Sequence, residues 1–159
     1  MPPPSRDDGY RVFAQSADTR IDIDAWNAHA VRFFATRVGI AREPRGGSNE
    51  RGPEDAAMLV VSPDGETAGL RSVIARPAEI DDYALAEAAD ARAGHTGLAL
   101  LARRCKTVWL VSREGPSDRL ALHLATIVAS VLLGPILDAS AGELFGIKTA
   151  RAKLAKSVP

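Results

Sequence analysis

Leu120–Leu137, LALHLATIVASVLLGPIL, is a stretch of eighteen residues without a formally charged side chain, and its interpretation decides the fold. A membrane-spanning helix needs roughly 20 predominantly apolar residues. Gly134-Pro135 is expected to end this helix after about fourteen residues, because glycine supplies a left-handed cap and proline cannot continue a helix. The stretch therefore predicts a buried helix over residues 117–133 of a soluble protein.

A narrow polar stripe runs along this predicted helix. At about 100° per residue its members fall within about 60° of the helix circumference, opposite a broad apolar side. We expect only this stripe to meet water. Polar groups in an otherwise apolar pocket are also typical of small-ligand sites, so the stripe is a candidate ligand-binding set. Its members are Arg119, His123, Thr126 and Ser130.

A second strip of the same helix consists of small side chains. Ala121, Ala125 and Ala129 recur at i, i+4 and i+8, which lets another element approach to about 8 Å. The neighbour is either part of the same chain or part of a second copy, and the sequence leaves both open. The three alanines are therefore candidate interface residues of a homodimer.

Composition indicates one neutral domain. The chain has 159 residues, of which 46% are hydrophobic, enough for a single core. Twenty basic and twenty acidic residues give a net charge of zero, so attraction to nucleic acid or an anionic membrane is not expected. The single cysteine and the absence of an apolar signal core in residues 1–9 predict a cytoplasmic protein with a flexible N-terminal tail.

The first half of the domain reads as a strand, a helix and a hairpin. Residues 10–15 have strand-like composition, and Asp24 is placed to cap a helix over 25–38 that Gly39 ends. The apolar face of that helix includes Trp26, Ala30, Phe33, Phe34 and Val38, which leaves His29 and Arg32 on its other face. Residues 42–55 predict a long mobile loop, and strands at 56–62 and 70–76 are expected to form a hairpin across Pro63-Asp64-Gly65.

The second half is mostly helical. Helices are expected over 80–93 and from 98, where Cys105 faces inward, and a strand over 107–114 leads into the long apolar helix. Ser140 and Glu143 have the spacing of a capping box before a final amphipathic helix. The inner side of that helix is expected to carry Leu144, Ile147 and Leu154.

The order β-α-β-β-α-α-β, followed by two C-terminal helices, predicts an α+β domain over 10–157 with a ferredoxin-like split βαβ. In that arrangement the first helix and the central helical hairpin share one face of an antiparallel sheet. An α/β three-layer sandwich is the alternative.

Catalytic and metal-binding chemistry is not indicated. The three histidines lie on separate predicted elements, and no paired cysteine or histidine spacing brings metal ligands together, so we expect no metal and no cofactor. Cys105 fits a buried structural thiol better than a nucleophile. The pairs Asp22/Asp24 and Asp81/Asp82 fit helix capping. An enzyme is therefore the less favoured class, because it requires convergence of residues that the sequence does not show.

One local motif indicates a different class. Gly94-His95-Thr96-Gly97 is a GxxG turn between two helices, and the order α-β-β-α-α-β around it resembles one KH topology, in which such a turn approaches RNA phosphates. The resemblance implies nucleic-acid binding through Gly94, His95, Thr96, Gly97, Arg103 and Arg104.

The leading functional prediction is a small cytoplasmic protein–protein interaction or assembly module without catalytic activity, with a homodimer as one form, because the long helix is apolar on more sides than one chain is expected to cover. A regulatory domain that binds a small ligand is the first alternative. KH-like nucleic-acid binding is the second.

Overall fold

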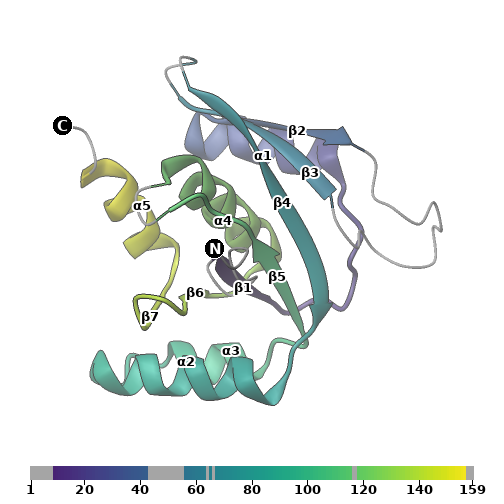
Figure 1. Cartoon of the computed structure of the whole chain (residues 1–159). Helices are drawn as coiled ribbons and strands as arrows, with labels where there is room; N and C mark the ends of the chain where they lie inside the picture. The colour runs from purple at the N-terminus through teal and green to yellow at the C-terminus, as the bar shows by residue number, and fades with distance from the viewer. Residues whose placement is uncertain (1–8, 43–55, 64, 66, 116–117, 157–159) are drawn as a thin grey trace, which may run out of the picture.

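A computed structural model of the chain describes residues 9–42, 56–63, 65, 67–115 and 118–156. Residues 1–8 of the predicted tail and 43–55 of the predicted loop lie outside this description. The described residues form five helices and a seven-stranded open antiparallel sheet, which is an α+β fold (Figure 1). The elements are β1 (Tyr10–Ala14), α1 (Ile23–Phe34), β2 (Arg37–Arg42), β3 (Ala56–Val61), β4 (Ala68–Pro77), α2 (Ile80–Arg92), α3 (Leu98–Arg103), β5 (Thr107–Val111), α4 (Arg119–Leu132), β6 (Ile136–Asp138), β7 (Glu143–Phe145) and α5 (Ile147–Lys156).

The strand order is β2-β3-β4-β5-β1-β6-β7, with every neighbouring pair antiparallel. The ferredoxin-like split βαβ is wrong in strand order, because it inserts the first strand between those at 70–76 and 107–114. Instead β4 pairs directly with β5, and β1 lies beyond β5. The cause is the α2–α3 hairpin, which returns the chain to the end of β4, where the Ala78 amide donates to the Lys106 carbonyl at 2.9 Å.

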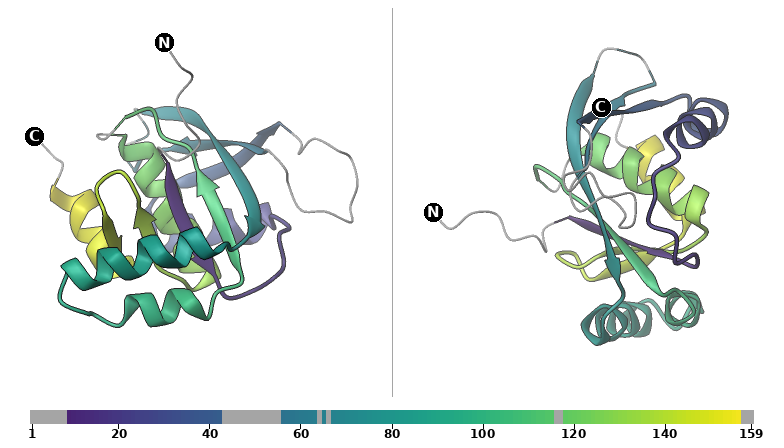
Figure 2. Two further views of the ribbon diagram at one scale, coloured as in Figure 1. Left: turned by 60° about the horizontal axis from the view of Figure 1, so that its bottom comes forward. Right: turned by 90° about the vertical axis from the view of Figure 1, so that its right-hand side faces the viewer.

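Helices lie on both faces of the sheet (Figure 2). We call the face that carries α1, α4 and α5 the α4 face, and the face that carries α2 and α3 the α2 face. All five residues of β1 are buried, with Val12 in the core of the α4 face and Phe13 beneath α2 and α3. Because side chains on both sides of this strand are buried, both sides must be covered. The predicted placement of α1 and the helical hairpin on one face is therefore wrong.

Helix α1 is shorter than the sequence suggests. It begins after Asp22, whose carboxylate accepts from the Ala25 amide, and it ends at Phe34 because Ala35 is left-handed with a φ of 51°. Val38 was predicted on the helix but lies in β2, opposite Val60. Val38 fitted the apolar pattern of the helix because its side chain does lie in the same core as α1. It reaches that core from strand β2.

Helix α4 lies within the predicted buried helix over residues 117–133 and is shorter at both ends. Asp118 caps its start by accepting from the Ala121 amide at 3.1 Å. At its end the left-handed residue is Leu133, with a φ of 59°, and not Gly134. Gly134 is needed for another reason, since a Cβ there would lie 1.7 Å from the Phe13 carbonyl oxygen. The glycine therefore allows the chain to pass close beside β1.

The C-terminal region contains a hairpin that the sequence analysis missed. Strands β6 and β7 have three residues each, too few to show a period-two pattern, and they pair from Ile136 opposite Phe145 to Asp138 opposite Glu143. The predicted capping box is wrong, because Glu143 belongs to β7 and α5 starts only at Ile147. By contrast, the predicted hairpin of β3 and β4 is confirmed by six paired positions from Ala56 to Val61.

Candidate functional site

The polar stripe of α4 does not form one exposed site. His123 and Thr126 are buried, and the Thr126 hydroxyl donates to the carbonyl of Leu122 in its own helix at 2.6 Å. Arg119 borders a cavity of about 480 Å³ at the start of α4, whereas Ser130 borders one of about 410 Å³ at its end. The four predicted ligand residues therefore lie on one helix but not around one cavity.

Two neighbouring helices bury this stripe. On the α1 side, the His29 ring nitrogen Nε2 lies 2.6 Å from the Ser130 hydroxyl. On the α5 side, Arg151 donates to the Phe33 carbonyl at 3.0 Å, with its guanidinium 4.5 Å from the centre of the Phe34 ring. The expectation that the stripe meets water is wrong for His123 and Thr126, which are buried, whereas Arg119 and Ser130 are half-buried.

His123 is a buried neutral base. Burial, together with the nearby charge of Arg119, lowers its pKa to about 4. Its Nδ1 lies 3.4 Å from the Thr36 hydroxyl, at the junction of α1 and α4. A base with this pKa stays uncharged near neutral pH, so His123 packs as a polar core residue there.

The GxxG turn is occupied by a carboxylate of the chain itself. Asp90 accepts from the Thr96 amide at 2.9 Å and from the Thr96 hydroxyl at 2.5 Å, and more weakly from the Gly97 amide at 3.4 Å. Hydrogen bonds from Thr96 lower the pKa of Asp90, despite the opposing effect of burial. The amides that would meet a phosphate thus already hold an anion, which opposes the KH-like alternative.

The remaining residues of that alternative lie around the same turn. Gly94 and Gly97 have positive φ angles, as does His95 with a φ of 59°. Arg103 is paired with Glu87 of α2, and Arg104 is exposed at the end of α3. The pairing of Arg103 reduces the positive charge available to a phosphate.

The alanine strip is covered within the chain. Ala121 and Ala125 are fully buried and Ala129 is 1% exposed, all in the core of the α4 face. Their small side chains do accompany close packing, as predicted, but they offer no surface to a second copy in this conformation.

Cys105 lies in the core beneath α2 and α3, as the sequence indicates. Burial raises the pKa of its thiol to about 11, and the thiol donates to the Leu101 carbonyl. A thiol with this pKa is almost entirely protonated near neutral pH, which makes it a poor nucleophile.

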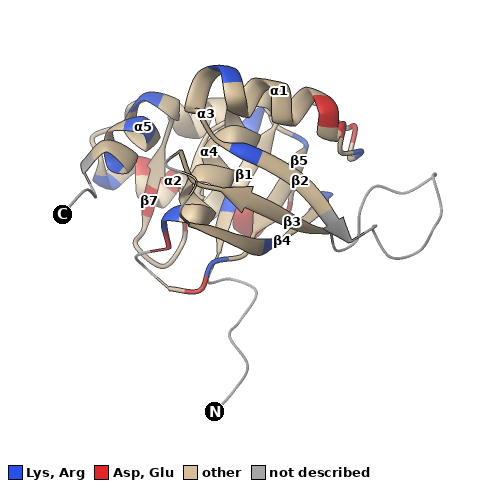
Figure 3. Ribbon diagram, turned by 90° about the horizontal axis from the view of Figure 1, so that it is seen from above, with Lys and Arg blue, Asp and Glu red and all other residues tan. Residues whose placement is uncertain are grey.

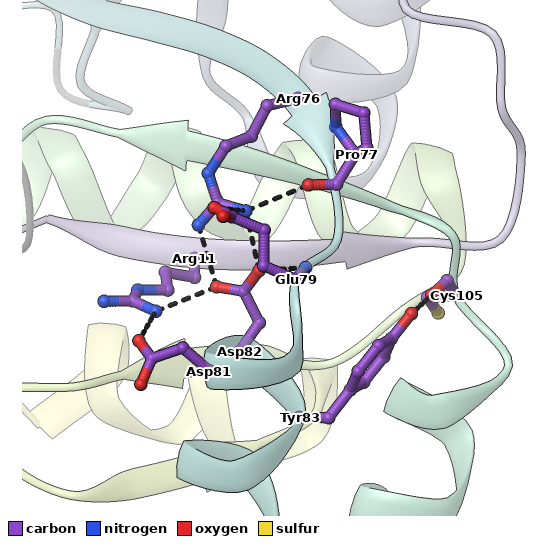
Figure 4. A network of polar contacts seen from close by, with 8 residues as sticks. All are labelled: Arg11, Arg76, Pro77, Glu79, Asp81, Asp82, Tyr83 and Cys105. Atoms are coloured by element: carbon purple, nitrogen blue, oxygen red, sulfur yellow. Dashed lines mark hydrogen bonds and ion pairs between the residues drawn. The ribbon is translucent and has the colours of Figure 1, made fainter.

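A buried ionic cluster anchors the start of α2 (Figure 4). The fully buried Asp82 accepts from Arg11 of β1 at 2.8 Å and from Arg76 of β4 at 2.6 and 2.8 Å, and it also caps α2 by accepting from the Glu79 amide. Burial raises the pKa of Asp82, but the hydrogen bonds from Arg76 and Glu79 and the positive charges outweigh it, so the net pKa is lowered. Each charged group here is held by the fold, which indicates a structural role.

An uncovered apolar area lies on the α2 face of β3 and β4. Strand alternation points Met58, Val60 and Val73 into the core of the α4 face, and the intervening residues outward. Leu59 and Leu70 are directly opposite each other and are 39% and 53% exposed. We call this area the open patch, and it comprises Ala57, Leu59, Val61, Leu70 and Ile74.

The open patch was not predicted from the sequence, and the reason is the composition of β3. The run AAMLVVS at 56–62 is apolar at almost every position, which is typical of a strand buried on both sides. A polar residue at every second position would have signalled a solvated face. The signal that could have found the patch is that, among the described elements, only α2 and α3 lie on that side of the sheet.

Comparison with known proteins finds no family model, curated protein or solved structure that matches the chain. Within the described residues, no three His, Cys, Asp or Glu side chains gather closely enough to hold a metal ion. A search of the same residues finds no helix long and apolar enough to span a membrane.

Proposed function

We propose that this protein is an assembly module that pairs with a second copy of itself through the open patch. The observation that carries the proposal is the directly opposed, exposed pair Leu59 and Leu70 on the outward side of the hairpin. Apolar surface of this kind is typical of interaction sites. The apolar centre of the patch suits an identical surface related by a two-fold axis, and Arg37, opposite Val61, lies at its margin.

The dimensions of the patch set the expected strength of the dimer. A six-residue strand such as β3 is about 20 Å long, and two strands are about 10 Å wide, which gives on the order of 200 Å² per copy. Stable interfaces bury about 1,200–2,000 Å² in total, so this dimer is expected to be weak. The association is therefore expected to be reversible.

The two exposed edges of the sheet are less suited to pairing. The β7 edge has three residues. The β2 edge has a register shift between Ile40 and Arg42, a feature that protects edges from strand addition. Face-to-face stacking of the open patch is therefore favoured over growth of the sheet.

Sedimentation equilibrium over a concentration series tests the proposal. The wild-type chain is expected to move from monomer to dimer as concentration rises through the dissociation constant. Leu70→Lys should keep the chain monomeric, because a lysine in the patch must lose its hydration on pairing. Leu100→Lys is the matched control, since Leu100 is 69% exposed on α3 away from the patch. Equal association of both variants would refute the proposal.

A further inference from the structure

A second candidate site is the cavity of about 410 Å³ at the end of α4, where α4 meets α3, the start of α5 and the residue after β1. The volume falls within the range of roughly 300–1,000 Å³ that is usual for small-molecule sites. Its wall is mostly apolar, with Leu98, Leu101, Leu133 and Ile147 as the large side chains. An aliphatic chain is the chemistry that such a wall accepts.

Two polar side chains line this cavity, and they differ in whether a hydrogen-bonding group is left for a ligand. Gln15 is engaged, because its Nε2 donates to the Leu133 carbonyl at 2.7 Å and so caps the end of α4. Ser130 has its hydroxyl 2.6 Å from His29 Nε2. When that nitrogen carries the hydrogen, His29 donates to the Ser130 oxygen, and the hydroxyl hydrogen is then available to a ligand.

The surroundings of the cavity favour a negatively charged ligand. None of its lining residues is acidic. Burial lowers the pKa of His29, and the nearby charges of Arg151 and Arg32 lower it further, which records the positive field at this position. Helix α5 starts at the cavity wall, has no acidic residue in its first turn and carries Lys148 and Arg151, and Figure 3 shows basic positions along it. Its Lys153 is paired with Glu143 at 3.0 Å.

We propose that this cavity binds a small aliphatic carboxylate, with its alkyl chain against the leucines and a carboxylate oxygen accepting a hydrogen bond from Ser130. His29 is a positioning residue, because it orients the Ser130 hydroxyl without touching the ligand. The site lies apart from the open patch and does not depend on the assembly proposal.

Isothermal titration calorimetry of the full chain with octanoate and with octan-1-ol tests the site. Octanoate is expected to bind with one-to-one stoichiometry and at least about tenfold more tightly than octan-1-ol, because only the carboxylate gains the charge-assisted bond to Ser130. Absence of octanoate binding, or equal affinity for the two probes, would overturn the proposal.

Gly146→Val locates the binding within the cavity. A Cβ at Gly146 would be in ordinary contact with Leu98 at 3.8 Å, so the variant is expected to fold while its side chain narrows the cavity. Octanoate affinity should fall at least about tenfold. Gly39→Val is the matched control, since a Cβ at Gly39 meets open space, and it should bind as the wild type does. Unchanged binding by Gly146→Val would place octanoate elsewhere and overturn the assignment.

The pH dependence of binding tests the role of His29 separately. A bound carboxylate favours protonated His29, so octanoate affinity should increase several-fold as pH falls from neutral through the lowered pKa of His29, and octan-1-ol affinity should not. Ser130→Ala should weaken octanoate binding and leave octan-1-ol binding unchanged. A loss of affinity for both probes would show that Ser130 only maintains the shape of the cavity, which contradicts the proposed contact.

Discussion

The two faces of the sheet are covered to different extents. On the α4 face, three helices bury a continuous apolar cluster in which Trp26, Trp109 and Leu124 are large members. On the α2 face, a single helical hairpin contributes small side chains such as Ala86 and Ala89, and α2 is fixed at its start by the ionic cluster around Asp82, as α4 is fixed at its start by the buried pair of Asp118 with Arg71. Three helices therefore cover one face, whereas an alanine-rich hairpin covers part of the other and leaves the open patch.

The largest loss of stability is expected from a buried charge on the α4 face. Ala125→Glu places a carboxylate in a fully buried position without a partner, so we expect the free energy of unfolding to fall by more than about 4 kcal/mol. Urea unfolding measures the loss. The exposed Ala28→Glu on α1 is the control, with a change within about 0.5 kcal/mol. A stable Ala125→Glu variant would mean that α4 is not closely packed.

Removal of the anchor tests the α2 face. Asp82→Ala leaves Arg11 buried without its closest carboxylate, and the free energy of unfolding should fall by about 3–5 kcal/mol. Glu87→Ala, on the same helix, removes an exposed pair with Arg103 and should cost at most about 1 kcal/mol. Similar losses in chemical denaturation of the two variants would show that the cluster does not anchor α2.

The pH dependence of the α4 face should report His123. Its pKa of about 4 lies below the unfolded value of about 6.5, so the unfolded chain binds more protons between these values. Stability from the neutral histidine is complete above about pH 6.5 and is lost as pH falls toward 4, by about 3 kcal/mol at most. Denaturation curves at several pH values should show this loss in the wild type and a smaller one in His123→Gln. Equal pH profiles would contradict the assignment.

The smallest effects concern helix ends. On the α4 face α1 ends at left-handed Ala35, with a φ of 51°, whereas the turn before α3 uses Gly97, with a φ of 95°. Ala35→Gly should raise the free energy of unfolding by about 0.5–1 kcal/mol, and Gly97→Ala should lower it by about 1 kcal/mol. Thermal unfolding of the two variants measures both shifts. Shifts of the same sign would contradict the backbone argument.

The sequence predicts the α4 face better than the α2 face, and the reason is physical. The apolar run of α4 carries its own period and stop signal, so its burial and length could be read locally. Arg11 and Asp82 are 71 positions apart, and nothing local marks them as partners. Val38 shows the opposite case. Its burial was predicted correctly, but its secondary structure was not, because that depends on the chain reversal at Ala35.

The candidate sites show the same limit. Ser130 was predicted as a polar contact and does border a cavity, but the cavity depends on α3 and α5, which the sequence did not place there. The open patch follows from the register of Leu59 with Leu70 and from the absence of a covering helix among the described elements. Pairing register and layer order are tertiary properties, and one sequence alone does not supply them.

The most direct measurement of the assembly account is methyl NMR of the wild-type chain over a dilution series. We expect the methyl signals of Leu59 and Leu70 to shift together with concentration, while those of Leu100 stay fixed, because only the open patch changes its surroundings on pairing. Signals of Leu59 and Leu70 that do not change with concentration, or that change no more than those of Leu100, would contradict the account.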